Sequence, residues 1–150
     1  MQPLMGVAKF ERLFRLSARL DVDKSDLRRL NEFLKQKVYD LLLIGQVAAK
    51  ANHRDIIQPW DLPITKGLQE SIAEFKALDE ELELSPILEH LATLPMLDLG
   101  YSVETEARLP DIVGALTISL AKTFKILDPD LKNPQAEHWE RAFGIFSMLL

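Results

Sequence analysis

The sequence predicts an all-α protein, and three observations support that prediction. Apolar residues recur every three or four positions along two long segments, which is the spacing of one helical stripe. Prolines and clusters of Asn, Asp and Ser separate the helical segments from one another. The order short, long and medium segment occurs twice along the 150 residues. We therefore expect two helical units.

The segment from about Asp23 to Ala51 is the longest helix expected in the first half. It contains no proline, and Asp23 or Ser25 can cap its N-terminus. Residues 41–44 are apolar on every side, so other elements are expected to cover this part all round. The contacts expected where it crosses the second long helix join Leu41, Leu42, Ile44 and Val47 to Leu116, Leu120 and Phe124.

Shorter elements flank this helix. A short amphipathic helix is expected over residues 7–18, and a connector over 19–22. Residues 55–57 have the pattern of a very short extended piece. A third helix is predicted to begin near residues 59–62 and to end at about Leu82; Pro63, one turn further on, is unfavourable there and can displace that start.

The second half follows the same order. Ser85 and Pro86 are expected to open a helix that ends before Pro95. A second long helix is predicted from about Glu104 to Leu127, with Pro110 either kinking it or marking its true start. A last helix is predicted over about residues 136–150.

The two halves also match residue by residue at a displacement of 79 positions. Trp60 then falls on Trp139, and Asp61 on Glu140. Because the tryptophans stand at matching helix starts, we predict packing anchors, although both can also stack on nucleic-acid bases. We interpret the chain as a single compact domain, residues 1–150, made of two pseudo-repeats over about 1–83 and 84–150.

A short–long–medium helical unit, paired so that two long helices cross, resembles the histone fold of archaeal histones. The loop after the first long helix carries the sharpest likeness, because Arg54 is followed seven residues later by Asp61. The resemblance implies a structural ion pair between these two side chains. With both units on one chain, the protein looks like the bacterial family of tandem histone-fold proteins, an intramolecular pseudo-dimer.

The residues with which archaeal histones hold duplex DNA are mostly replaced. Arg12 matches the arginine of the first helix, but Asp21 occupies the first-loop position. The second-loop lysines and threonine are replaced by Asp55, Ile56 and Gln58, and the second unit has Gly100, Pro134, Gln135 and Glu137 at the corresponding positions. Duplex affinity depends mainly on neutralising phosphates with Lys and Arg. The resemblance therefore predicts the fold better than it predicts DNA binding.

The charge is distributed unevenly. Residues 1–79 carry a net charge of +2 and residues 80–150 one of −7. A DNA-binding surface, if present, is expected on the basic residues of the first half, which are Lys9, Arg12, Arg15, Arg19, Arg28 and Arg29. The other interpretation of these residues is a solvated helix face with ion pairs one turn apart.

The remaining patterns indicate no enzyme, cofactor or metal site. Cysteine is absent, and His53, His90 and His138 lack the spacing of zinc ligands. No apolar run is long enough to span a membrane, and the N-terminus lacks the pattern of a signal peptide, so we expect a cytoplasmic location, with the nucleoid as the site of action if DNA is bound.

Two functions remain open. In the first, the protein is a non-enzymatic interaction module that pairs with another protein or with itself, without a small-molecule substrate. In the alternative, it is an architectural, nucleoid-type protein that binds duplex DNA weakly and without sequence preference. We also expect close helix crossings at Gly45 and Gly114, since glycine inside a helix costs about 1 kcal/mol relative to alanine.

Overall fold

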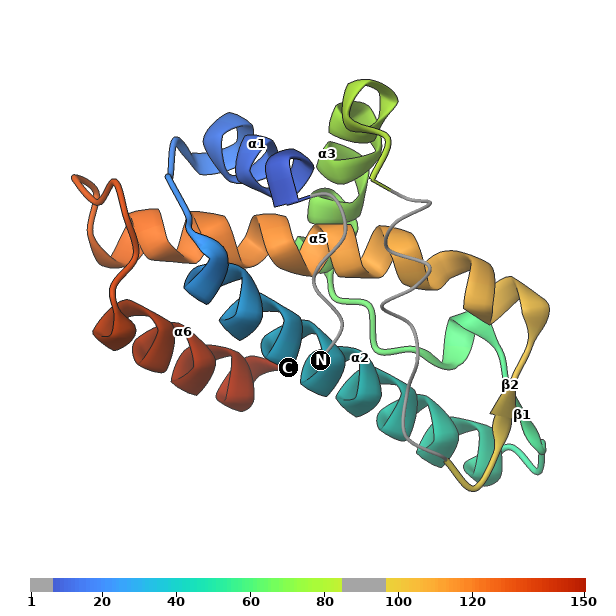
Figure 1. The fold of residues 1–150 in the computed structure, drawn as a ribbon. Helices are drawn as coiled ribbons and strands as arrows, with labels where there is room; N and C mark the ends of the chain where they lie inside the picture. Colours follow the sequence, from blue (N-terminus) through green and yellow to red (C-terminus); the bar gives the residue numbers. More distant parts are fainter. Residues whose placement is uncertain (1–6, 85–96) are drawn as a thin grey trace.

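The computed structural model describes residues 7–84 and 97–150, which are almost entirely helical (Figure 1). The elements are α1 (Val7–Ala18), α2 (Lys24–Ala51), β1 (Ile56–Ile57), a 3₁₀ turn (Pro59–Asp61), α3 (Lys66–Leu82), β2 (Gly100–Tyr101), α5 (Val103–Leu127) and α6 (Ala136–Leu149). The all-α prediction is confirmed. The helix predicted after Ser85 lies outside the described residues.

The two long helices begin in the same way. The Asp23 side chain accepts a hydrogen bond from the Asp26 N–H at 2.9 Å, and the Asp26 side chain accepts one from the Asp23 N–H at 3.0 Å. At the start of α5, the Ser102 hydroxyl accepts from the Thr105 N–H at 3.1 Å. Each cap satisfies backbone donors that a first helical turn leaves unpaired. The first residues of α2 and α5, Lys24 and Val103, are 79 positions apart.

The third helix begins later than predicted. Residues 59–61 form only a 3₁₀ turn, and α3 starts at Lys66 with Thr65 as its N-cap. Pro63 explains the delay, because its ring and missing N–H are incompatible with the second turn of a helix that began at residue 59. Pro110, by contrast, lies inside α5, in the second turn from its start at Val103.

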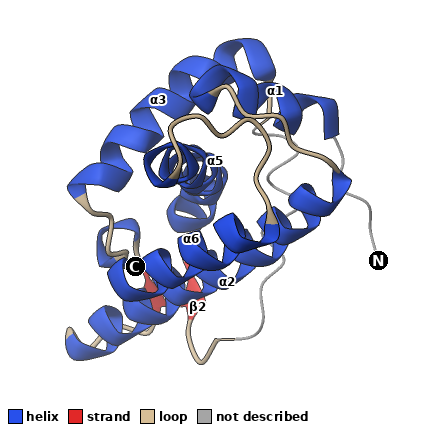
Figure 2. Cartoon of the chain, turned by 90° about the vertical axis from the view of Figure 1, so that its left-hand side faces the viewer, coloured by secondary structure: helices blue, strands red, loops and turns tan. Residues whose placement is uncertain are grey.

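The helix that is covered on all sides is α5. Figure 2 shows α5 nearly end-on, with α1 and α3 on one side and α2 on the other, and α5 contacts all three as well as α6. Every residue from Ile112 to Ile118 is buried. The expectation that the centre of α2 is covered all round is wrong, because Leu41 and Leu42 are buried whereas Leu43 and Ile44 are exposed. One face of α2 therefore packs inward, and the opposite face meets solvent.

Glycine brings α3 close to α5. A Cβ built on Gly114 would lie 2.3 Å from two ring carbons of Phe75, a fully buried residue of α3. On α2, a Cβ on Gly45 would approach side-chain atoms of Ile57 and Leu62 at 3.1 Å. The two glycines thus permit close approaches, as expected, but to α3 and to a loop rather than between the long helices.

Loops from the two halves meet at two places. β1 pairs in parallel with β2, placing Ile56 opposite Gly100 and Ile57 opposite Tyr101. In the second place, the Asp21 N–H donates to the Lys132 carbonyl at 2.7 Å. In both cases the loop before one long helix contacts the loop after the other.

Candidate interaction surfaces

An ion pair fixes the loop that follows α2. Arg54 Nη1 and Nη2 each donate to one oxygen of the Asp61 carboxylate at 2.6 Å, so the predicted pair is present in bidentate form. The same carboxylate accepts from the Gln58 N–H at 2.8 Å. These hydrogen bonds to the charged form, with that from Arg54 the largest cause, lower the pKa of Asp61. The pair holds the residues between β1 and α3 in one conformation.

Trp139 is a packing anchor, as predicted. It is 1% exposed, its ring meets Phe124 and Phe143 edge-on, and its Nε1–H donates to Asp26 Oδ1 at 2.9 Å. Desolvation raises the pKa of Asp26, while the hydrogen bonds from the Asp23 N–H and Trp139 favour the carboxylate. The aromatic cluster continues to α2 through Phe33, which stacks on Phe143 with ring centroids 5.4 Å apart. This cluster attaches α6 to α2 and α5.

Trp60 is not a packing anchor, which corrects the prediction. Its side chain is 73% exposed, and the Arg54 guanidinium lies 5.9 Å from its ring centroid. Its counterpart Trp139 reaches Asp26, but the residue that matches Asp26 in the second half is Thr105. The Thr105 hydroxyl donates to the Ile57 carbonyl at 2.8 Å. Trp60 therefore has no equivalent buried acceptor and remains at the surface.

The basic residues proposed for DNA binding divide into two groups. Lys9 donates to the Glu83 carbonyl at 3.3 Å, Arg12 pairs with Glu81 at 3.5 Å, and Arg15 pairs with Asp21 at 3.2 Å. In the part of the chain that the structure describes, Arg19, Arg28 and Arg29 make no ion pair. We call these three the unpaired arginines. Acids from α3 and from the loop before α2 thus neutralise much of the basic face of α1.

An apolar surface runs along the solvent side of α2. It consists of Leu43, Ile44 and Val47, and the last two are 52% and 60% exposed. The spacing i, i+1, i+4 places them together on one side of the helix, which we call the outer face of α2. Asp40 and Lys50 stand one turn before and one turn after this face. Sequence reasoning missed this surface because it placed Ile44 and Val47 in the crossing with α5.

Two of the three histidines, His53 and His138, lie in the described part of the chain, and neither belongs to a metal-binding cluster. Within residues 7–84 and 97–150, no three His, Cys, Asp or Glu side chains gather in a way that would hold a metal ion. His138 is buried and accepts a hydrogen bond from the Gln135 N–H through Nδ1 at 2.9 Å, so it caps α6. His90 lies outside the described residues. None of the described helices is long and apolar enough to cross a bilayer.

Comparison with known proteins gives a family and a fold. The family described as "Domain of unknown function (DUF1931)" matches residues 10–147. Two proteins of Aquifex aeolicus, both named "Uncharacterized protein", are 26% identical over 120 residues and 28% identical over 141 residues. These alignments cover 80% and 85% of this chain, and 70% and 82% of the relatives.

Two solved structures are similar over nearly the whole chain. A crystal structure from Thermus thermophilus is 54% identical, with a TM-score of 0.87 and coverage of 98% of this chain and 99% of that one. A protein from Aquifex aeolicus is 24% identical, with a TM-score of 0.85 and coverage of 100% and 99%. The second likeness shows the fold alone.

Proposed function

The chain belongs to the DUF1931 family, and we propose that it is a non-enzymatic interaction module built from two histone-fold-like units, which pairs with another protein or with a second copy of itself. The first residues of α2 and α5 are 79 positions apart, which is the displacement at which the two halves match, and this supports the tandem interpretation. So do the two loop contacts, each between the loop before one long helix and the loop after the other.

The outer face of α2 is the observation on which the pairing function rests. Three neighbouring apolar side chains on a helix lose stabilisation if they stay in water, and contiguous exposed apolar groups commonly mark interaction sites. Asp40 and Lys50 flank this face with opposite charges. An antiparallel second copy of α2 would bring Asp40 of each chain toward Lys50 of the other. In the single chain Asp40 pairs with Lys37 at 3.3 Å and Lys50 with Asp98 at 3.0 Å, so self-pairing rests on the apolar side chains and these charges only add to it.

Sedimentation equilibrium tests this proposal. We expect the wild-type mass to rise with concentration, and the Val47→Glu substitution to abolish the rise by placing like charges in the contact. Ile126→Glu is the matched control, because Ile126 occupies the same place in the second half and is 80% exposed on α5. If the wild-type chain remains monomeric at every concentration, self-pairing is refuted. If a protein partner binds the Val47→Glu variant as well as the wild type, the outer face of α2 is not the binding site.

The unpaired arginines support a second candidate, architectural binding of duplex DNA. They give a polyanion three cations in the basic half of the chain. Wrapping duplex DNA requires cations repeated along the path of the DNA, and the second half carries −7. A gel-shift series over salt with random duplex DNA tests this candidate, for which we expect binding only at low salt and without sequence preference.

A further inference from the structure

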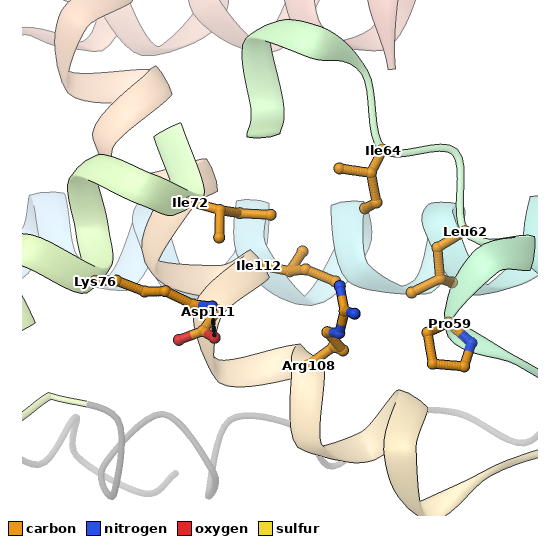
Figure 3. Close-up of a pocket in the computed structure, with 8 residues that line it drawn as sticks. All are labelled: Pro59, Leu62, Ile64, Ile72, Lys76, Arg108, Asp111 and Ile112. Atoms are coloured by element: carbon orange, nitrogen blue, oxygen red, sulfur yellow. Dashed lines mark ion pairs between the residues drawn. The ribbon is translucent and has the colours of Figure 1, made fainter. Parts of the chain in front are cut away.

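A groove lies beside α5, where the residues before α3 cross it. Its volume is about 570 Å³, and its walls include Trp60, Leu62, Ile64, Gln69, Ile72 and Arg108. At the inner end it continues toward Asp111 and Ile112 (Figure 3). Trp60 and Arg108 are both exposed, so the groove is open along its rim.

Pro63 contributes to the shape of this groove. Pro63 matches Ala142, which is fully buried inside α6. Alanine lets α6 begin at Ala136 and carry Trp139 into the core. Pro63 prevents the equivalent turns of α3, so the chain from Pro59 to Thr65 is not α-helical and Trp60 stays outside. The resulting groove is larger than the pocket of about 310 Å³ that Phe33 and Phe143 line on the α6 side.

The walls of the groove combine apolar and cationic groups. Leu62 is buried, and Ile64 and Ile72 are partly buried against the core. Arg108 carries the only guanidinium in the wall, and among the described residues no carboxylate pairs with it. Asp111, one turn further along α5, is already paired with Lys76 at 3.6 Å. The groove thus has one positive charge that no described carboxylate compensates.

We propose that this groove binds an extended peptide segment of a partner protein, in which an apolar side chain is followed or preceded closely by an aspartate or glutamate. The apolar side chain packs on Leu62, Ile64 and the Trp60 ring, and the carboxylate pairs with Arg108. Large aromatic and arginine side chains are the usual energetic centres of protein interfaces.

A single uncompensated cation suits a single carboxylate. A nucleic-acid strand would require a row of cations along the groove, and Lys76 is held by Asp111 while Lys66 is held by Glu70 at 2.6 Å. An open groove also leaves a small molecule half in water, whereas small-molecule sites bury most of their ligand. The inference rests on the proposed function, because it requires an interaction module, but it uses a surface separate from the outer face of α2.

Selection of a displayed random heptapeptide library on the full chain supplies the probes. The enriched peptides are then synthesised and titrated while acrylamide quenching of tryptophan is followed. Trp139 is buried, so the quenchable signal belongs to Trp60, and the Trp60→Phe variant gives the baseline. We expect the enriched peptides to combine an acid with an apolar residue and to protect Trp60 from the quencher.

Arg108→Gln should weaken these peptides by at least about threefold, and Trp60→Ala by more than about tenfold. Arg141→Gln, an exposed arginine on α6, is the matched control and should leave affinity unchanged. Replacing the peptide acid by its amide should weaken binding to the wild type but not to Arg108→Gln, because the two changes remove the same pair.

Three results would overturn the inference: no enrichment over an unrelated protein, enrichment of peptides without an acid, or equal affinity for wild type and Arg108→Gln. A fourth is protection of Trp60 by a 20-nucleotide oligo-dT that depends on Arg108, which would assign the groove to single-stranded nucleic acid. The Val47→Glu variant should bind the peptides normally, and Trp60→Ala should self-associate normally. A failure of the groove is therefore distinguishable from a failure of the outer face of α2.

Discussion

Replacing Gly114 by alanine should destabilise the protein, although alanine is the better helix former. The added Cβ would lie 2.3 Å from Cδ1 and Cε1 of Phe75 and 2.4 Å from its Cγ. Ordinary carbon contacts begin at roughly 3.5 Å, so the ring or the helix must move by about 1.2 Å. Phe75 is fully buried, so moving its ring displaces other core side chains.

The magnitude follows from two opposing effects. Overpacking of a filled core costs about 1–3 kcal/mol, and the severe overlap here favours the upper end. Alanine recovers about 1 kcal/mol of helix propensity. We expect a net loss of about 2 kcal/mol in the free energy of unfolding, which lowers Tm by roughly 4–8 °C in a chain of this size.

Gly144→Ala is the matched control. Gly144 is exposed within α6, and a Cβ there would meet nothing within 4 Å. The same substitution should therefore raise the free energy of unfolding by about 0.5–1 kcal/mol. Chemical denaturation of both variants with urea, followed by circular dichroism, measures the two values.

The test can refute the reasoning. If Gly114→Ala is as stable as the wild type, α3 and α5 do not pack as closely as the structure places them. The double variant Gly114→Ala/Phe75→Leu should be less destabilised than the sum of its two single changes, because leucine removes the ring that the Cβ meets. Strict additivity would show that the loss arises elsewhere.

Further predictions test the core, the ion pair and the charge distribution. Leu42→Ala should lower the free energy of unfolding by about 2–5 kcal/mol, and Leu43→Ala, at an exposed position, by much less. Equal losses on denaturation would contradict the burial of one face of α2 and the exposure of the other. A double-mutant cycle at Arg54 and Asp61 should give a favourable coupling energy, because the double variant should lose less stability than the sum of the two single variants. Additive losses would count against the bidentate pair. Because the folded-state pKa of Asp61 is lowered, the stability it contributes is present above its unfolded pKa of about 3.9 and is lost as pH falls through the folded pKa. In Arg54→Ala, the free energy of unfolding should therefore fall less steeply with decreasing pH than in the wild type. Random duplex DNA should bind only at low salt, and not at all after charge reversal of the unpaired arginines. Micromolar affinity in a gel shift at about 150 mM salt that survives this reversal would refute the weight given to charge.

Helix periodicity and capping residues predicted most of the secondary structure. The bounds of α1, α2, α5 and α6 agree with the expected ones to within one residue at most ends. The sequence offers Asp23 or Ser25 as the cap of α2, and the structure has Asp23 in that role, with a reciprocal bond to Asp26. Local chemistry determines such features, so a single sequence contains the signal.

Which helix is buried on all sides was not predictable in the same way. Residues 41–44 are as apolar as the centre of α5, yet Leu43 and Ile44 meet solvent. Burial depends on how many elements pack against a helix, and periodicity does not report that number. A better signal was available in α5, because small residues, Gly114 and Ala115, stand among its apolar ones and permit close approach on several sides.

Pro63 was the signal that could have corrected the assignment of Trp60. A helix start at residue 59 places a proline in its second turn, so the chain there had to leave the α-helix. Trp60 then cannot follow the path of Trp139 into the core, whatever the similarity of the two positions. The matching tryptophans favour the proposed repeat, but a shared packing role does not follow from their positions.

The differences between the two halves indicate where this protein can interact. Leu30 and Leu109, which match between the halves, are both buried in the core. At Asp26 and Thr105 the halves differ. Asp26 accepts a hydrogen bond from buried Trp139, whereas Thr105 donates to the Ile57 backbone carbonyl and Trp60 remains exposed. A side chain that remains exposed, as Trp60 does, is accessible to an external partner. For this reason we look for binding at the groove beside Trp60 and Arg108, which is larger than the pocket of about 310 Å³ between Phe33 and Phe143 on the α6 side.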